Sequence, residues 1–284
     1  ATATAVGILA KNALEGYGDY EQLVGGVEKL FKESSDQIMG YAENAYKTAG
    51  LSANQYMETV TGFAASLIQS VGGDTAKAAK MADTAITVMA DNAYKMGTEM
   101  ASIQNAYQGF AKQNYTMLDN LKLGYGGTKE EMERLLADAE KLSGIKYDIS
   151  SYADIVQAIH EVQNEMGITG TTAKEASETI QGSVSAAKSA WENLVAGLGN
   201  ENADISGLVK KFSDSILTTG KNIVPRIEQI LKGIGEAIKG ISPIIGEIVP
   251  AILTNILPQL VSAGTQLLVS ISDGIISAMP QLLE

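Results

Sequence analysis

The residue types that most often carry out chemistry are scarce in this sequence. His160 is the one histidine among 284 residues, and cysteine is absent. A histidine general base or a histidine metal cluster would depend on a single side chain, and thiolate chemistry is excluded. His160 stands between Ile159 and Glu161 in a predicted helix, and we interpret it as a histidine at the surface or at the edge of the core.

A glycine-rich stretch, GYGGTK at residues 124–129, loosely resembles a phosphate-binding loop. Such loops follow a strand and have the spacing G-x-x-x-x-G-K-[ST]; this stretch has neither feature, so we interpret it as a helix connector. The neighbouring Glu130, Glu131 and Glu133 fall in the first turn of a predicted helix, where the helix dipole favours them. We assign no catalytic residue, no cofactor-binding residue and no metal ligand, and we expect a protein that is not an enzyme.

Trp191 is the one tryptophan of the chain. It lies in an alanine-rich predicted helix, close to Leu194, Val195 and Leu198, and this position favours a role as a packing anchor. The alternative is a docking hot spot for a partner, because tryptophan is enriched at such positions.

The elements that position these residues are predicted to be helices throughout. Six consecutive segments begin at a capping residue and end at a glycine, and five of them have the spacing of a capping box. The predicted N-caps are Ser34, Ser52, Asp74, Thr128, Ser151 and Thr172, and the segments span residues 34–50, 52–72, 74–97, 128–144, 151–167 and 172–199. The sequence therefore predicts an all-α fold.

Three regions are expected along the chain. Residues 1–24 are predicted to be the end of an upstream helix and a linker, and residues 25–200 a compact, bundle-like domain of several helices. Apolar residues at helical spacing support that domain, as in Met132, Leu135, Leu136, Ala139 and Leu142. Residues 201–284 are predicted to be a long hydrophobic region of coiled-coil and repeat helices. We expect the chain to be a piece of a longer protein.

The last region carries a heptad pattern of aliphatic residues. The seam consists of Ile227, Leu231, Ile234, Ile238, Ile241, Ile245, Ile248 and Ile252. Prolines and glycines in the same stretch fall outside these positions. Such a pattern is typical of a self-associating helix, and isoleucine at both core positions of the heptad favours trimers or larger assemblies over dimers.

Residues 248–272 form a stretch without a charged residue, and this stretch is long enough to cross a bilayer. Pro250, Asn255, Pro258 and Gln259 interrupt this stretch with polar groups or helix breakers. Two interpretations stay open: a seam buried between protein copies, or insertion into a membrane under some conditions.

The chain has a net charge of −12. A protein that binds DNA needs a basic face to displace counterions, so this charge argues against specific binding of nucleic acid.

The central block resembles the conserved helical region of phage tail tape measure proteins from long-tailed phages and prophages of Gram-positive bacteria. The resemblance is carried by residues 102–199, which begin SIQNAYQGFAKQNYTMLDN, and upstream by YEQLVGGVEKLF (20–31) and AYKTAGLSANQYMETV (45–60). The proline-punctuated tail after residue 225 is similar to the hydrophobic repeats that follow this region in the family.

The resemblance implies a structural protein of the virion that sets tail length, scaffolds polymerisation of the tail tube and takes part in genome ejection. It implies self-association as a trimer or hexamer, and partners among the tail-tube protein, the tail assembly chaperones and the tail-tip or distal tail proteins. It places the protein in the tail lumen, in the host cytoplasm during assembly and, on ejection, at the host membrane.

Two other functions are kept as alternatives. A membrane-active, pore-forming helical protein would make liposomes leak. A generic helical adaptor would be a stable monomer that binds one partner through residues 25–200.

Overall fold

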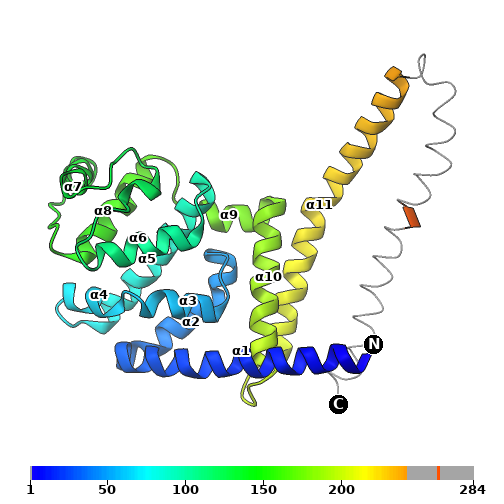
Figure 1. Ribbon diagram of the computed structural model, residues 1–284, viewed down its shortest axis with the longest axis horizontal. Helices are drawn as coiled ribbons and strands as arrows, with labels where there is room; N and C mark the ends of the chain where they lie inside the picture. The colour runs from blue at the N-terminus through cyan, green and yellow to red at the C-terminus, as the bar shows by residue number, and fades with distance from the viewer. Residues whose placement is uncertain (1, 242–260, 263–284) are drawn as a thin grey trace. The chain divides into compact units, whose positions relative to one another are not determined.

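Helices make up all the secondary structure in the part of the chain that the structure describes. The computed structural model describes residues 2–241 and 261–262, and no strand occurs among them (Figure 1). The predicted all-α class is confirmed. The chain divides into two packed units, residues 1–223 and residues 224–284, which are described separately.

The first unit holds a succession of mostly short helices. They are α1 (Thr2–Phe31), η1 (Lys32–Ser34), α2 (Ser35–Thr48), α3 (Ala53–Thr61), α4 (Ala64–Ser70), α5 (Thr75–Met96), α6 (Met100–Phe110), η2 (Leu118–Leu121), α7 (Lys129–Ser143), α8 (Tyr152–Glu165), α9 (Thr171–Glu178) and α10 (Ile180–Gly197). The last helix, α11 (Ile205–Ile241), begins in the first unit and continues into the second.

Helix α5 is the centre of the first unit (Figure 1). It packs against α1, α2, α3, α4, α6, α8 and α9. Its buried face is rich in small residues, namely Ala78, Ala79, Ala82, Ala85, Ala90 and Ala93. Larger side chains from the surrounding helices complete the core, among them the fully buried Phe31, Tyr46, Tyr56, Tyr107 and Phe110.

Four of the six predicted N-caps are confirmed. Ser52 forms a complete capping box with Gln55, and Asp74, Thr128 and Ser151 each accept a hydrogen bond from the backbone N–H three residues later. Five predicted stops are confirmed as well. The glycines that follow α2, α4, α5, α7 and α8 adopt the left-handed conformation, namely Gly50, Gly72, Gly97, Gly144 and Gly167.

The predicted cap at Ser34 is wrong. Its hydroxyl lies 3.0 Å from the Thr75 hydroxyl, in a contact between η1 and the start of α5, and makes no bond to its own helix.

The predicted single helix over 52–72 is observed as two helices, α3 and α4. The break turns Phe63 into the core, where its ring packs on Tyr152 with the centroids 5.8 Å apart.

The predicted helix over 172–199 is likewise divided. Thr179 is extended (φ −112°, ψ 156°) and its hydroxyl caps α10 by accepting the Gly182 N–H at 3.0 Å. Thr172 is therefore not an N-cap. It lies in the first turn of α9, and its N–H donates to the Asp91 carboxylate of α5.

The predicted regions differ from the packed units. Helix α1 runs without interruption across residues 24 and 25, and it packs against α2, α3 and α10, so residues 1–24 belong to the first unit. At the other end, the first half of α11 packs on α10, which carries the first unit past residue 200 to residue 223.

A buried tyrosine and a partly buried carboxylate join α3 to α5. The Tyr56 hydroxyl donates to Asp83 Oδ1 at 2.9 Å. Burial raises the pKa of Asp83, although the bond from Tyr56 opposes that shift, and burial raises the pKa of Tyr56 well above its usual value.

The environment of Asp83 predicts that Asp83→Asn increases the free energy of unfolding, by an amount that depends on pH. Because the folded-state pKa of Asp83 is raised, its ionisation destabilises the fold, and the cost grows as the pH rises through that pKa. Asparagine accepts the same bond without the charge, so the variant should be more stable than the parent in urea at pH 7, and the difference should shrink near pH 4. Asp119→Asn, at an exposed site, is the control. Equal losses for Asp83→Asn at both pH values would contradict the prediction.

Candidate self-association surface

The predicted seam is exposed where the structure describes its side chains. In the second unit, Ile227, Leu231 and Ile234 are 49%, 58% and 47% exposed on α11. Ile238 and Ile241 belong to the same helix, but their side chains are outside the described ones. The seam residues Ile245, Ile248 and Ile252 lie outside the described residues, so the coiled coil itself stays a prediction.

Two residues that the sequence analysis missed belong to this surface. Val224 is 53% exposed and precedes Leu231 by seven residues, so it extends one core position of the heptad upstream. Ile230 is 60% exposed and flanks Leu231, which widens the stripe. Extending the heptad backwards from Leu231 finds Val224 in the sequence. A widened stripe lets a helix contact two neighbours, as in trimers and larger bundles.

The other faces of this part of α11 are polar. Arg226, Glu228, Gln229 and Lys232 are exposed, and the Arg226 guanidinium donates to Gln229 Oε1 at 3.2 Å. The helix continues through Pro225, which stands outside the seam. One apolar and one polar face on a helix indicate that the apolar face meets another apolar surface. We name Val224, Ile227, Ile230, Leu231 and Ile234 the α11 seam.

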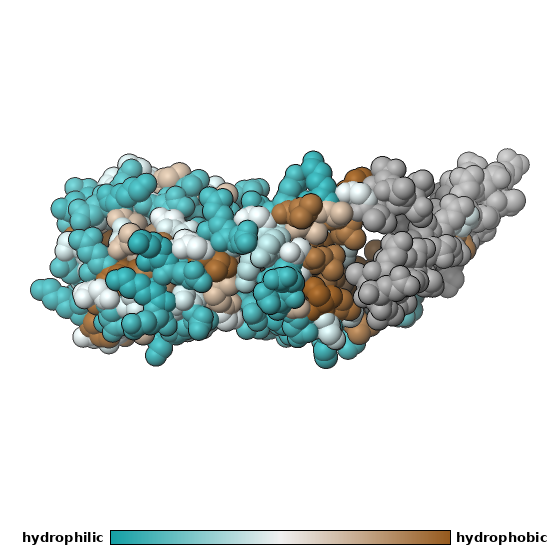
Figure 2. Space-filling model, turned by 90° about the horizontal axis from the view of Figure 1, so that it is seen from below, coloured by the Kyte–Doolittle hydropathy of each residue, from teal (hydrophilic) through white to brown (hydrophobic). Residues whose placement is uncertain are grey.

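Exposed apolar residues also occur on the first unit, chiefly on α1, α10 and the first half of α11. They include Ile8, Leu14, Ile180, Val184, Ile216 and Leu217. On the face drawn in Figure 2, apolar residues gather in this part of the unit, whereas the part that contains α2 to α8 is mostly hydrophilic.

Trp191, the other predicted site residue, has a mixed environment. Its ring packs on Phe212 of α11 with the centroids 5.3 Å apart and the planes tilted by 49°. It remains 42% exposed. The contact supports the packing interpretation, while the exposed fraction leaves area for a partner.

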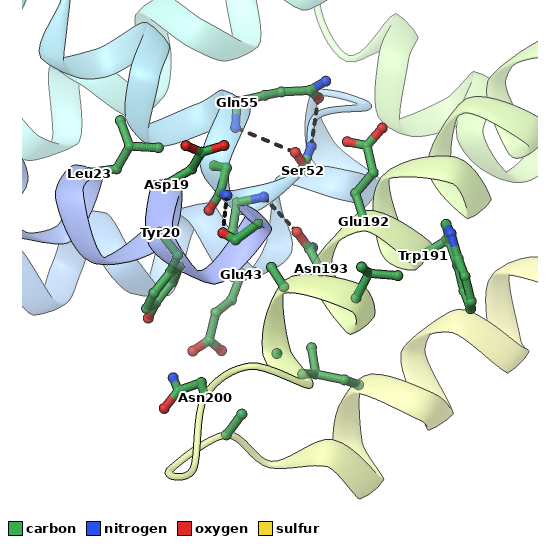
Figure 3. A pocket seen from close by; sticks show the side chains of 18 of the residues that line it. Asp19, Tyr20, Leu23, Glu43, Ser52, Gln55, Trp191, Glu192, Asn193 and Asn200 are labelled. Carbon is green, nitrogen blue, oxygen red and sulfur yellow. Dashed lines mark hydrogen bonds between the residues drawn. The ribbon is translucent and has the colours of Figure 1, made fainter. Parts of the chain in front are cut away.

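Trp191 also borders a pocket of about 980 Å³ between α1, α3, α10 and the turn into α11 (Figure 3). Hydrogen bonds between distant segments hold its walls. Asn193 Oδ1 of α10 accepts the Ala53 N–H at 2.7 Å, and Asn54 Nδ2 of α3 donates to the Gly16 carbonyl of α1 at 2.9 Å.

The pocket is acidic. Its lining carboxylates are Asp19, Glu43, Glu58, Glu192 and Asp204, and the one lining cation is Lys211. Several of these charges are already paired, since Lys211 Nζ lies 3.6 Å from Glu43 and Glu192 lies 3.9 Å from Lys188. The Ser52 hydroxyl at the edge of the pocket is engaged in its capping box, where it accepts the Gln55 N–H (Figure 3).

The other residues considered for chemistry take structural positions. His160 is half-buried on α8, and its Nδ1 has no hydrogen-bond partner in the structure. In the GYGGTK segment, Glu131 accepts the Gly126 N–H at 2.9 Å and Arg134 donates to the Gly124 carbonyl at 2.7 Å. The bond from Arg134 holds the pKa of Glu131 below its usual value. The segment is therefore closed by its own helix, with a carboxylate where a phosphate loop would receive an anion.

Within the described residues, no group of three or more histidines and carboxylates is placed to hold a metal ion. A search of the same residues for a helix both long and apolar enough to span a bilayer also found none.

Comparison of this chain with family models, with curated proteins and with solved structures found no match. The resemblance to tape measure proteins thus stays an expectation from the residues themselves.

The packing role of Trp191 predicts a loss of stability on truncation. Trp191→Ala should lower the free energy of unfolding by about 1–2 kcal/mol, because a half-buried aromatic pair is lost, while Trp191→Phe should keep most of it. Urea denaturation of the full chain measures both variants. An unchanged free energy of unfolding in Trp191→Ala would contradict the packing interpretation and favour the alternative, that Trp191 docks a partner.

Proposed function

We propose that this chain is a phage tail tape measure protein, a structural component of the virion that sets tail length, scaffolds the tail tube and takes part in genome ejection. The observation that carries the proposal is the exposed α11 seam, which lies C-terminal to the block that resembles the family. Aliphatic side chains at heptad spacing are exposed to solvent in an isolated chain. Association with copies of the same helix would bury them.

The dimensions of α11 suit a ruler. Its 37 residues correspond to about 55 Å at the rise of an α-helix. Helices joined along a heptad seam keep a common register, so each added residue lengthens the whole assembly by the same increment. A trimer or hexamer would be the assembled form.

The first unit would supply contacts to the assembly partners, which are the tail-tube protein, the tail assembly chaperones and the tail-tip proteins. Its exposed apolar residues on α1, α10 and α11 offer area for such contacts. The net charge of −12 would repel DNA that passes along the same lumen.

A membrane-active protein is the second candidate, because an amphipathic helix such as α11 also binds the surface of a bilayer. The two candidates differ in what covers the seam. In the first it is other copies of the chain, and in the second it is lipid.

The proposal predicts the mass of the full chain in solution. Light scattering should give three or six times the monomer mass of 29.9 kDa, with no change when liposomes are added. Leu231→Lys places a charge in the seam and should return the monomer. Gln229→Lys adds the same charge on the polar face of the same helix and should leave the assembly intact.

A monomer that associates only with liposomes would support the membrane-active protein instead. A monomer indifferent to lipid would favour the adaptor and overturn the proposed self-association.

Ruler function has its own test. Inserting four heptads of seam sequence after Ile234 should lengthen the tails of virions that carry the chain by about 42 Å, measured by electron microscopy. Tails of unchanged length would contradict a ruler even if the chain forms trimers.

A further inference from the structure

A single residue separates helices α9 and α10. Thr179 is extended between Glu178, which ends α9, and Ile180, which begins α10. The sequence over 171–197 contains no proline, and its pattern predicts one uninterrupted helix. At the break, the Thr179 hydroxyl caps α10 locally, and contacts from elsewhere in the first unit hold both ends of α9.

The amino end of α9 is held by a buried carboxylate. Asp91 of α5 has no exposed surface, and its two oxygens accept the Gly170 N–H at 2.7 Å and the Thr172 N–H at 2.8 Å. These groups are among the unsatisfied donors at the start of a helix, so Asp91 caps α9 from a distant position.

The carboxyl end of α9 is held by α11. Asn222 Nδ2 donates to the carbonyls of Ser177 and Thr179, both at 3.1 Å. Nearby, the Thr219 hydroxyl of α11 donates to the Ser183 carbonyl of α10 at 3.0 Å. Asn222 therefore satisfies the Ser177 carbonyl near the break, whereas the Thr179 carbonyl also accepts the Ser183 N–H of α10 at 3.1 Å.

The two elements involved are lightly packed. Thr172 is the one buried residue of α9, and Ser215 is the one buried residue in the first half of α11, residues 205–222. Helix α10, by contrast, buries eight. Elements with few buried contacts open at the lowest free-energy cost. We therefore expect α9 and the first half of α11 to detach from the rest of the first unit more readily than α10 does.

In the broken form, only glycine fits at residue 182. A Cβ built there would lie 2.4 Å from the carbonyl carbon and oxygen of Glu175, because the break folds the first turn of α10 onto the last turn of α9. In a continuous helix, residues seven apart are separated by about 10 Å along the axis, and the space beside Gly182 is open.

We propose that α9 is a two-state segment. In one state it is clipped by Asp91 and Asn222, as described above; in the other it joins α10 as a single helix over 171–197. The joined helix would be 27 residues and about 40 Å long, and it would satisfy its own backbone at residues 177–182. Release of the first half of α11 removes one of the two clips and shifts the population towards the joined helix. The inference concerns the first unit alone and does not rest on the proposed function.

The chain suits a distance measurement because it has no native cysteine. Lys174→Cys on α9 and Lys188→Cys on α10 replace side chains that are 71% and 75% exposed. Spin labels at these positions in the full chain report the distance between the two helices by pulsed electron resonance. A joined helix places the two Cα atoms about 21 Å apart, and the bend at Thr179 brings them closer.

The parent should give one short distance. Asn222→Ala should raise the ratio of long to short distances about fivefold, the effect of losing a partly buried hydrogen-bonding group. Gly182→Ala should shift the population further and raise helicity in circular dichroism, since alanine is the better helix former and blocks the bend. Thr218→Ala is the matched control, because the Thr218 hydroxyl bonds only to its own helix at Asp214.

Trp191 gives a second readout. Release of α11 separates its ring from Phe212, so its emission should move to longer wavelength together with the distance change. Asn222→Ala with the short distance of the parent would overturn the proposal. A second result would also overturn the proposal. In it, Gly182→Ala loses helicity while Thr179→Ala keeps the short distance of the parent. Thr179→Ala is the comparison because it removes the α10 cap but adds no Cβ at residue 182.

Discussion

The close approach of helices to α5 is the constraint on which the first unit depends. Alanine occupies most of the buried face of α5, so seven other helices come near enough to share one core. The volume is then filled by aromatic residues of the outer helices, such as Tyr56 and Tyr107. A larger side chain at one of these alanines would push apart elements that are far separated in sequence. The small residues of α5 and the aromatic residues of the outer helices therefore complement each other in the core.

Local signals in the sequence predicted the helix ends well and the helix breaks poorly. Ser52, Asp74, Thr128 and Ser151 cap their helices through bonds within three residues, so residue type and spacing are sufficient to find them. At the two breaks, Phe63 contacts Tyr152 and Thr179 contacts Asn222, and these partners lie tens of residues away. No pattern in a single sequence reports such contacts. The pocket could not be predicted for the same reason, because Asn193 and Asn54 join its walls through bonds to residues far away in the sequence.

Helix α11 combines two kinds of sequence. Its first half carries polar residues that bond to the carbonyls of α9 and α10, as Thr219 and Asn222 do, and this half belongs to the first unit. Its second half carries the α11 seam. The heptad spacing predicted the seam because a repeat of seven is a property of the sequence alone. The docking of the first half had no such signal, so the sequence placed the end of the compact domain at residue 200.

The bond between Asn193 and the Ala53 N–H has a consequence for synthesis of the chain. The two residues are 140 positions apart, and a similar bond joins the Ser189 hydroxyl to the Gly50 carbonyl across 139 positions. At translation rates of about 5–20 residues per second, the start of α3 waits roughly 7–28 s for its partner on α10 to leave the ribosome. During that interval α1 lacks one of the helices it packs against, and its apolar residues are available to other proteins. Contacts of such long range also slow folding after release, so any factor that binds the nascent chain would meet α1 and α3 before the first unit closes over them.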